Sequence, residues 1–330
     1  MLQLTNDTPF APSFAVLPDA QGIDTLHTVL KGTVTLRPSI ALADPQVPPV
    51  QADEYYGDPA LSSLKAASEL HIGKPGTDVL LVGSAWAPES REVPRSQVIL
   101  EVAGRRKTLL ISGDRVWHRG RPSAPVPFVS MPLVWERAFG GFHRVGDRVL
   151  AEERNPVGCG FAGGRSPEAM EGLPVPNIED VASPLQQVGD SPGPAGLAPI
   201  SASWLPRRQF AGTYDEVWQR TRAPFLPDDF DPRFLQCAPG EFAFERYLQP
   251  GEAVRAWGVM PDGPIQFTVP DARLDVSVTI AGTEEHPAVN LETLLIEPDQ
   301  NRVCFTWRAV QPCDRRALKV ERIVIRRRSA

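Results

Sequence analysis

The sequence predicts a mainly β protein: antiparallel, two-layer, sandwich-like sheets with a long irregular Pro/Gly-rich central segment and few short helices. Proline supplies 35 of the 330 residues, roughly twice its average usage of about 5%, and proline interrupts both helices and central strands. Apolar and polar residues alternate with strand periodicity in the first and last thirds of the chain. Turn residues separate these stretches at the spacing of about 8–12 residues that is typical of sandwiches.

The N-terminal part, residues 1–131, reads as a β-sheet with one helix. Alternation over Ile23–Leu36 predicts its first long strand. Asp58-Pro59 offers an N-cap followed by proline at the first helical position, so we expect a short helix from there to about Leu70. Further strands are predicted at residues 78–86, 97–103, 107–112 and 114–118.

The C-terminal part, residues 241–330, returns to strand patterns joined by turn sequences such as Pro261-Asp-Gly-Pro264. We predict a single domain over residues 1–330, in which the first and last thirds supply the layers and the middle covers them. The predicted strands are residues 241–247, 252–260, 265–269, 273–280, 291–297, 302–310 and 317–325.

Residues 132–240 form the central segment, where Pro, Gly, Asn and Asp alternate with aromatic residues and arginine. A stretch of this length without periodicity is either functional or disordered, and its many aromatic residues argue against disorder. One helix is expected, because Thr213-Tyr-Asp-Glu216 has the form of a capping box, and it places Tyr214 and Trp218 on one face.

Composition excludes several classes of function. A net charge of −6 and a pI near 5.5 give no basic face for nucleic acid. No export signal is predicted, and no apolar run approaches about 20 residues, so we expect a soluble cytoplasmic protein without a membrane partner. Four scattered cysteines and five separated histidines predict no disulfide framework, metal or cofactor. A pair between Cys304 and Cys313 remains open, although reduced thiols are the default.

Two patterns are compatible with catalysis. Gly158-Cys-Gly-Phe-Ala-Gly163 matches a dinucleotide fingerprint, but neither a strand nor a helix is predicted around it, which favours a turn-rich loop. Two of Glu136, Glu179 and Asp215 could serve glycoside hydrolysis. The alternative is structural: an internal Glu136–Arg137 ion pair, and a cap or turn role for Asp215.

Arginine recurs beside aromatic residues throughout the central segment, a composition that is enriched at protein–protein hot spots. In the alternative interpretation, each arginine ties down its own loop. If the segment binds a partner, the candidate residues are Trp135, Arg137, Phe139, Trp204, Arg207, Tyr214, Trp218, Phe230 and Arg233.

Several motifs in fixed order resemble a bacterial family of domains of unknown function associated with type VI secretion. The resemblance covers about Leu26 to Ile325. It rests on Trp135-Glu-Arg-Ala-Phe-Gly-Gly141, Asn155-Pro-Val-Gly-Cys-Gly-Phe161, Leu173-Pro-Val-Pro-Asn-Ile-Glu179, Ala211-Gly-Thr-Tyr-Asp215, Pro227-Asp-Asp-Phe-Asp231, Arg233-Phe234, Leu291-Glu-Thr-Leu-Leu-Ile-Glu-Pro-Asp299 and Thr306-Trp-Arg-Ala309.

The resemblance implies a non-enzymatic adaptor or chaperone. Such a protein would bind a secreted effector with a PAAR-type tip and help to load it onto the spike protein. The family offers no catalytic residues to carry over. A carbohydrate-active β-sandwich hydrolase and a structural component of the secretion particle remain the alternatives.

Overall fold

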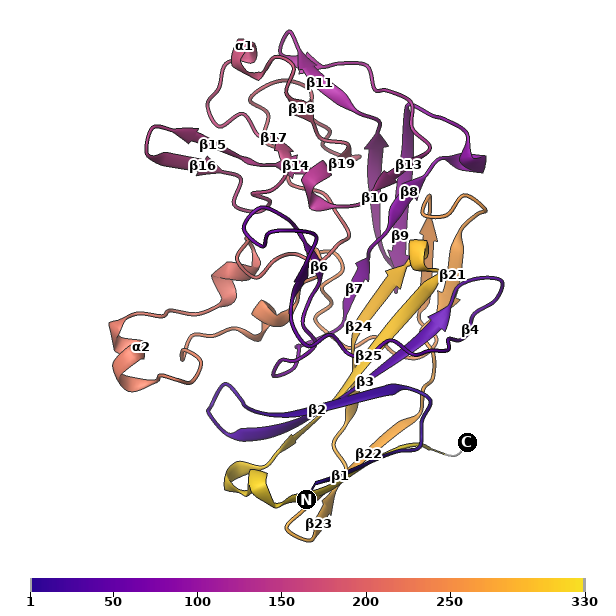
Figure 1. Ribbon diagram of the computed structural model, residues 1–330, viewed down its shortest axis with the longest axis vertical. Coiled ribbons are helices and arrows are strands. Elements are labelled where there is room, and N and C mark those ends of the chain that lie inside the picture. The colour runs from indigo at the N-terminus through magenta and orange to yellow at the C-terminus, as the bar shows by residue number, and fades with distance from the viewer. Residues whose placement is uncertain (1, 329–330) are drawn as a thin grey trace.

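The computed structural model describes residues 2–328 and confirms the mainly β fold (Figure 1). Its largest sheet has the order β2-β3-β25-β24-β7, with β4 added to β3, and combines strands from both ends of the chain. All its pairs are antiparallel except β7 with β24. The strands are β2 (Ala11–Pro18), β3 (Asp24–Thr35), β4 (Ala41–Leu42), β7 (Asp78–Leu81), β24 (Val289–Glu297) and β25 (Arg302–Pro312).

Two further sheets pack against this one. The five-stranded sheet has the order β19-β10-β9-β20-β21, and the four-stranded sheet has the order β1-β26-β22-β23 with β1 and β26 parallel. Their strands are β9 (Arg95–Val102), β10 (Arg105–Ser112), β19 (Ile178–Asp180), β20 (Ala253–Trp257) and β21 (Ile265–Thr268), then β1 (Gln3–Asn6), β22 (Leu274–Ile280), β23 (Thr283–Glu285) and β26 (Val320–Arg327).

Short elements make up the rest of the described chain. The strands are β5 (Glu54–Tyr55), β6 (Leu64–Ala66), β8 (Ser84–Trp86), β11 (Arg115–His118), β12 (Arg121–Pro122), β13 (Ser130–Pro132), β14 (Phe139–Gly140), β15 (Phe142–Val145), β16 (Arg148–Ala151), β17 (Cys159–Gly160) and β18 (Pro174–Val175). The helices are α1 (Pro167–Met170), α2 (Glu216–Thr221) and the 3₁₀ turns η1 (Pro88–Ser90), η2 (Trp135–Arg137), η3 (Arg207–Phe210), η4 (Pro232–Leu235), η5 (Pro298–Gln300) and η6 (Asp314–Lys319).

The largest sheet has one apolar face and one charged face. Leu30, Phe305 and Trp307 belong to the apolar cores shared with the other two sheets. Because successive strand residues point to opposite faces, Lys31 and Arg308 lie on the other face. Both are buried, since residues that precede β7 in the chain supply partners that cover them.

Six buried charges on this second face form what we call the ionic layer: Lys31, Glu69, Lys74, Asp78, Glu292 and Arg308. They pair as three ion pairs of opposite sign, Lys31–Glu69 at 2.8 Å, Lys74–Asp78 at 2.8 Å and Arg308–Glu292 at 2.6 Å. Buried charges persist where pairing and further hydrogen bonds satisfy them. The layer therefore fixes the covering segment to the sheet by polar contacts.

Two histidines beside the ionic layer are held uncharged. Neither ring nitrogen of His27 has a hydrogen-bond partner, and burial, followed by the Arg308 guanidinium, lowers the pKa of His27 to about 4. Burial and then Arg308 also hold the pKa of His71 well below its ordinary value. His71 Nδ1 accepts the Gly73 N–H at 3.1 Å, which requires an unprotonated nitrogen.

The fold is therefore expected to lose stability in mild acid. A histidine in the unfolded chain has a pKa near 6.5, whereas folded His27 has a pKa of about 4. Between these two pH values the unfolded chain therefore binds a proton at this residue that the folded protein does not bind. Stability falls as pH drops through this window, by about 2 kcal/mol from His27 alone at pH 5. Urea unfolding at about pH 7.5 and about pH 5 measures the loss. His27→Leu should lose about 2 kcal/mol less between the two pH values, and equal losses in both proteins would contradict this account.

Two predicted elements are wrong. No helix follows Asp58, which starts only a single turn. The Ser63 N–H and hydroxyl bind the Glu136 carboxylate instead, and Leu64–Ala66 pairs with β5. Residues 241–247 form no strand, although Phe242 and Phe244 are buried as the alternation indicated. Tertiary contacts override local propensity in both places.

Asn155 holds the central segment together. Its buried side-chain amide donates to the carbonyls of Trp135 and Phe139 at 2.8 and 3.0 Å. Gly140 and Gly158 lie so close to Asn155 that a Cβ at either position would overlap it. The motifs around Phe139 and Cys159 therefore pack against each other through Asn155, and only glycine at positions 140 and 158 leaves room for its side chain. We call this contact of Asn155 with Gly140 and Gly158 the interlock.

Candidate functional site

Of the nine candidate partner-binding residues, four are buried and five are half-buried or exposed. Trp135, Phe139, Trp204 and Arg207 are buried. The Trp135 and Trp204 rings pack edge to face at 6.4 Å, and Trp135 Nε1 donates to the Pro199 carbonyl. These side chains form the scaffold, and a partner cannot reach them in the folded chain.

The arginines of this scaffold tie down loops. Arg207 donates to the carbonyl of Phe234 at 3.0 Å and to that of Ile200. Arg137 donates to Asp114 and Asn177 at 3.1 and 3.0 Å, so the predicted Glu136–Arg137 ion pair is wrong. Both arginines have the contacts expected of loop anchors.

Three of the remaining candidates belong to an arm, residues 211–231, that projects from the body of the molecule and carries α2 (Figure 1). The fourth, Arg233, lies at its base, where its guanidinium sits 4.3 Å from the centroid of the Phe210 ring and pairs with Asp231. Phe230 packs edge to face on Phe234 at 5.9 Å. Aromatic and ionic contacts thus fix the root of the arm.

Contacts among its own residues order the arm. Asp215, rather than the predicted Thr213, caps α2 by accepting the Trp218 N–H at 2.8 Å; Thr213 instead binds Asp229 through its N–H and hydroxyl. As predicted, the Tyr214 and Trp218 rings meet, at 4.8 Å between centroids. Exposed aromatic side chains on a pre-ordered segment suit binding, because little entropy remains to be lost.

The arm also touches the turn between β2 and β3. Arg222 donates to the Ala20 carbonyl, and the Phe225 ring lies against Gly22, where a Cβ would come within 3.1 Å of it. Gly22 has a φ of +82°, so glycine is favoured there for conformation as well as for space. The outer surface of the arm remains open: Tyr214 is 54% exposed, Val217 57% and Phe225 38%.

A second projection was missed in the sequence. The hairpin of β15 and β16 carries four exposed apolar side chains, Phe142 at 53%, Val145 at 52%, Val149 at 53% and Leu150 at 42%. The signal was Gly146-Asp147 between two short apolar stretches, a two-residue hairpin turn. Figure 1 shows this hairpin and the arm projecting on the same side of the molecule. We call the two together the apolar projections.

The candidate catalytic groups do not assemble into one constellation. The Glu136 carboxylate binds Ser63, Glu179 pairs with buried Arg115 at 2.6 Å, and Asp215 caps α2. Gly158–Gly163 contains the two-residue strand β17 and ends in a turn, so it does not join a strand to a helix as a nucleotide site does.

None of the four cysteine thiols in the described chain is activated as a nucleophile. All four cysteines are free, so Cys304 and Cys313 do not pair. Burial raises the pKa of Cys159 to about 12 and that of Cys237 to about 11, which keeps both thiols protonated. Within residues 2–328, no cluster of three His, Cys, Asp or Glu side chains could hold a metal ion.

Comparison with known proteins gives one match. A family model described as an uncharacterized protein conserved in bacteria (DUF2169) matches residues 21–308, most of the chain. No curated protein and no solved structure matches it. Among the described residues, no helix has the length and apolar character needed to cross a membrane.

Proposed function

The chain belongs to a bacterial family described as an uncharacterized protein conserved in bacteria (DUF2169). From the motif resemblance we propose that it is a type VI secretion adaptor or chaperone. In this role it binds a secreted effector with a PAAR-type tip in the cytoplasm and helps to load it onto the spike protein. The motif resemblance supports the assignment to this system, and the surface of the molecule supports a binding role.

The observation that carries the binding role is the pair of apolar projections. Scattered exposed apolar residues are ordinary on a monomer, but contiguous exposed patches mark interaction sites. Here seven exposed apolar side chains lie on two extensions that project from the body of the molecule. On the hairpin, the strand register places Phe142 and Val149 on one face and Val145 and Leu150 on the other. An effector segment held between them would cover the exposed side chains and be shielded from aggregation until loading.

The hydrolase alternative has no supporting contact, since its three acids have three separate partners. Retaining and inverting glycosidases both need two carboxylates flanking one bond, about 5 to 9.5 Å apart. A structural role in the secretion particle would require a stable homo-oligomer with a large apolar interface. Size-exclusion chromatography of the purified chain separates that role from a monomeric adaptor.

Affinity capture tests the proposal. The tagged full chain, expressed in its own bacterium, should retain a PAAR-tipped effector or the spike protein, identified by mass spectrometry. Val149→Asp with Leu150→Asp, and separately Tyr214→Asp with Val217→Asp, should each reduce recovery at least tenfold, because a carboxylate would be desolvated at the interface.

A matched control introduces the same chemistry elsewhere. Leu318 on η6 is fully exposed, so Leu318→Asp should leave recovery unchanged. Thermal unfolding confirms that each variant folds. A folded monomer that retains neither class of protein, or variants that retain them as well as wild type, would contradict the proposal.

A further inference from the structure

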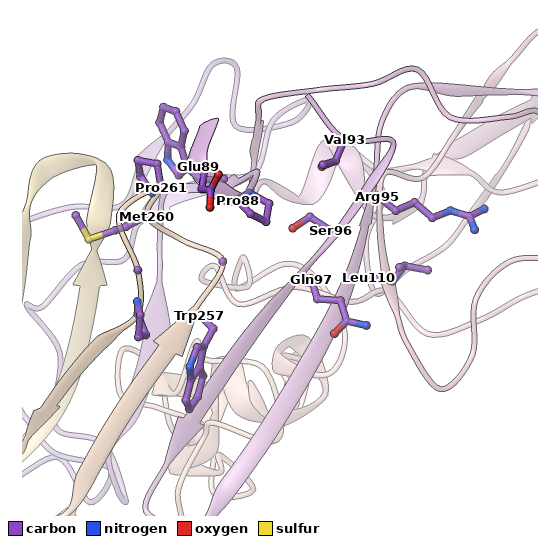
Figure 2. Close-up of a pocket in the computed structure, with 14 residues that line it drawn as sticks. Pro88, Glu89, Val93, Arg95, Ser96, Gln97, Leu110, Trp257, Met260 and Pro261 are labelled. Carbon is purple, nitrogen blue, oxygen red and sulfur yellow. The ribbon is translucent and has the colours of Figure 1, made fainter. Parts of the chain in front are cut away.

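A pocket lies away from the apolar projections, at the end of β20. It is a groove of about 660 Å³ between the segment around η1 and the β20–β21 loop. Figure 2 shows Trp257, Met260 and Pro261 on one side, Pro88 and Glu89 near the top, and Ser96 and Gln97 between them and Arg95. Neither the motifs nor the proposed function accounts for it.

An unpaired stretch of strand edge faces this groove. β9 and β10 are joined by a two-residue turn, Ala103 and Gly104, both with positive φ, which places the backbone groups of Val102 toward β10. Alternate residues therefore face β20, in agreement with the bond from the Ala103 N–H to the Ala253 carbonyl at 3.1 Å. By the same alternation, the backbone groups of Gln97 and Arg95 face the β20 side.

β20 ends before it reaches these residues. Its last residue, Trp257, pairs with Ile99, and the chain then turns at Gly258, which has a φ of +75° and lies against the Gln97 carbonyl. The Gly258 carbonyl accepts the Trp86 N–H at 2.8 Å instead of continuing the ladder. In the described chain, no strand pairs with Gln97 or Arg95 on this side.

The groove beside the β9 edge is apolar near Trp257 and carries a cation, Arg95, at its other end. Trp86, Trp257, Met260 and several prolines line the groove. Arg95 forms no ion pair or side-chain hydrogen bond with any described residue, whereas the nearby Glu89 pairs with Arg91 at 3.1 Å. A ligand thus meets flat apolar walls and one free guanidinium, which favours carboxylates.

We propose that this groove binds an extended peptide segment of a partner protein by adding it to the free edge of β9. A proline or aliphatic side chain of the segment packs between the tryptophans, and an acidic side chain pairs with Arg95. Strand addition combines main-chain hydrogen bonds with side-chain pockets in this way. The site is separate from the apolar projections, so each can fail its test without the other.

The strand edge distinguishes a peptide from a sugar. Tryptophan rings stack on either ligand, but outward-facing backbone groups spaced as in a β-ladder match the amide spacing of an extended chain. Because Gly258 covers the Gln97 carbonyl, only the Gln97 N–H and the backbone groups of Arg95 are open, and the ladder is short. We therefore expect weak binding, with a Kd on the order of micromolar.

The probe is a phage library of random ten-residue peptides panned against the full chain. Enriched peptides should share an acidic residue and a proline or aliphatic residue. Their fluorescein-labelled synthetic forms should bind at least tenfold more weakly to Trp257→Ala and to Arg95→Glu. The exposed Arg315→Glu should bind them like wild type. N-methylation of the peptide should weaken binding at alternate positions, and amide exchange should slow over residues 93–99.

Three results would overturn the inference. The first is a panning that enriches no peptide over bare support. The second is a set of enriched peptides that folded Arg95→Glu binds as tightly as wild type does. The third is a glycan array that retains the chain through Trp257 while no peptide binds, because the groove would then be a carbohydrate site.

Discussion

Replacing Arg308 by methionine should lower the free energy of unfolding by about 3–5 kcal/mol, the usual cost of removing one partner of a buried ion pair. The Arg308 Nε donates to Glu292 at 2.6 Å, and its Nη2 donates to the Glu69 carbonyl at 2.6 Å. Methionine fills much of the volume but leaves the Glu292 carboxylate buried beside His71 without a cation. The unpaired charge, rather than a cavity, causes the loss.

Urea unfolding at neutral pH measures this effect. The control is Arg91→Met, since the Arg91–Glu89 pair is largely exposed and exposed pairs contribute about 0–1 kcal/mol. The double variant Arg308→Met/Glu292→Leu should regain part of the loss by removing the unpaired carboxylate. An Arg308→Met protein as stable as the control would show that the ionic layer does not anchor the covering segment.

Replacing Asn155 by alanine should lower the free energy of unfolding by about 2–4 kcal/mol. The change leaves the buried carbonyls of Trp135 and Phe139 without the amide donor, and each unsatisfied group costs about 1–3 kcal/mol. The interlock with Gly140 and Gly158 also loses the side chain that fills it, which adds a cavity cost.

The matched control is Asn290→Ala, because the side chain of Asn290 forms no hydrogen bond among the described residues. It should cost much less than Asn155→Ala in the same unfolding experiment. Limited proteolysis should show new cleavage within residues 132–200 of Asn155→Ala, since this part of the segment depends on the interlock. A variant with wild-type stability and an unchanged digest would contradict the structural role assigned to Asn155.

Periodicity predicted the strands well where alternation was long. β3, β25 and β26 each continue over several alternating residues, and hydrophobic burial on one face sets their positions. The ionic layer could not be foreseen, because Glu69 and Arg308 are far apart in sequence and each resembles a surface charge. Only the fold brings them together in a buried layer.

The candidate site was predicted in part. Tyr214 and Trp218 do lie on an exposed arm, but Trp135 and Trp204 share their composition and are buried. Residue type does not distinguish a core tryptophan from an interface tryptophan, because both bury large apolar area. The groove was invisible in the sequence, since it arises where β20 stops at Gly258 and leaves β9 unpaired.

The central claim is that the apolar projections hold an effector, and site-specific photo-crosslinking in the native bacterium tests it most directly. A photoreactive phenylalanine analogue replaces Val149 on the hairpin, Val217 on the arm or, as control, exposed Glu284 on β23. We expect the first two positions to crosslink to the same PAAR-tipped effector and the control to give no such product. Absence of that effector at both Val149 and Val217, with the folded protein present at wild-type level, would contradict the account.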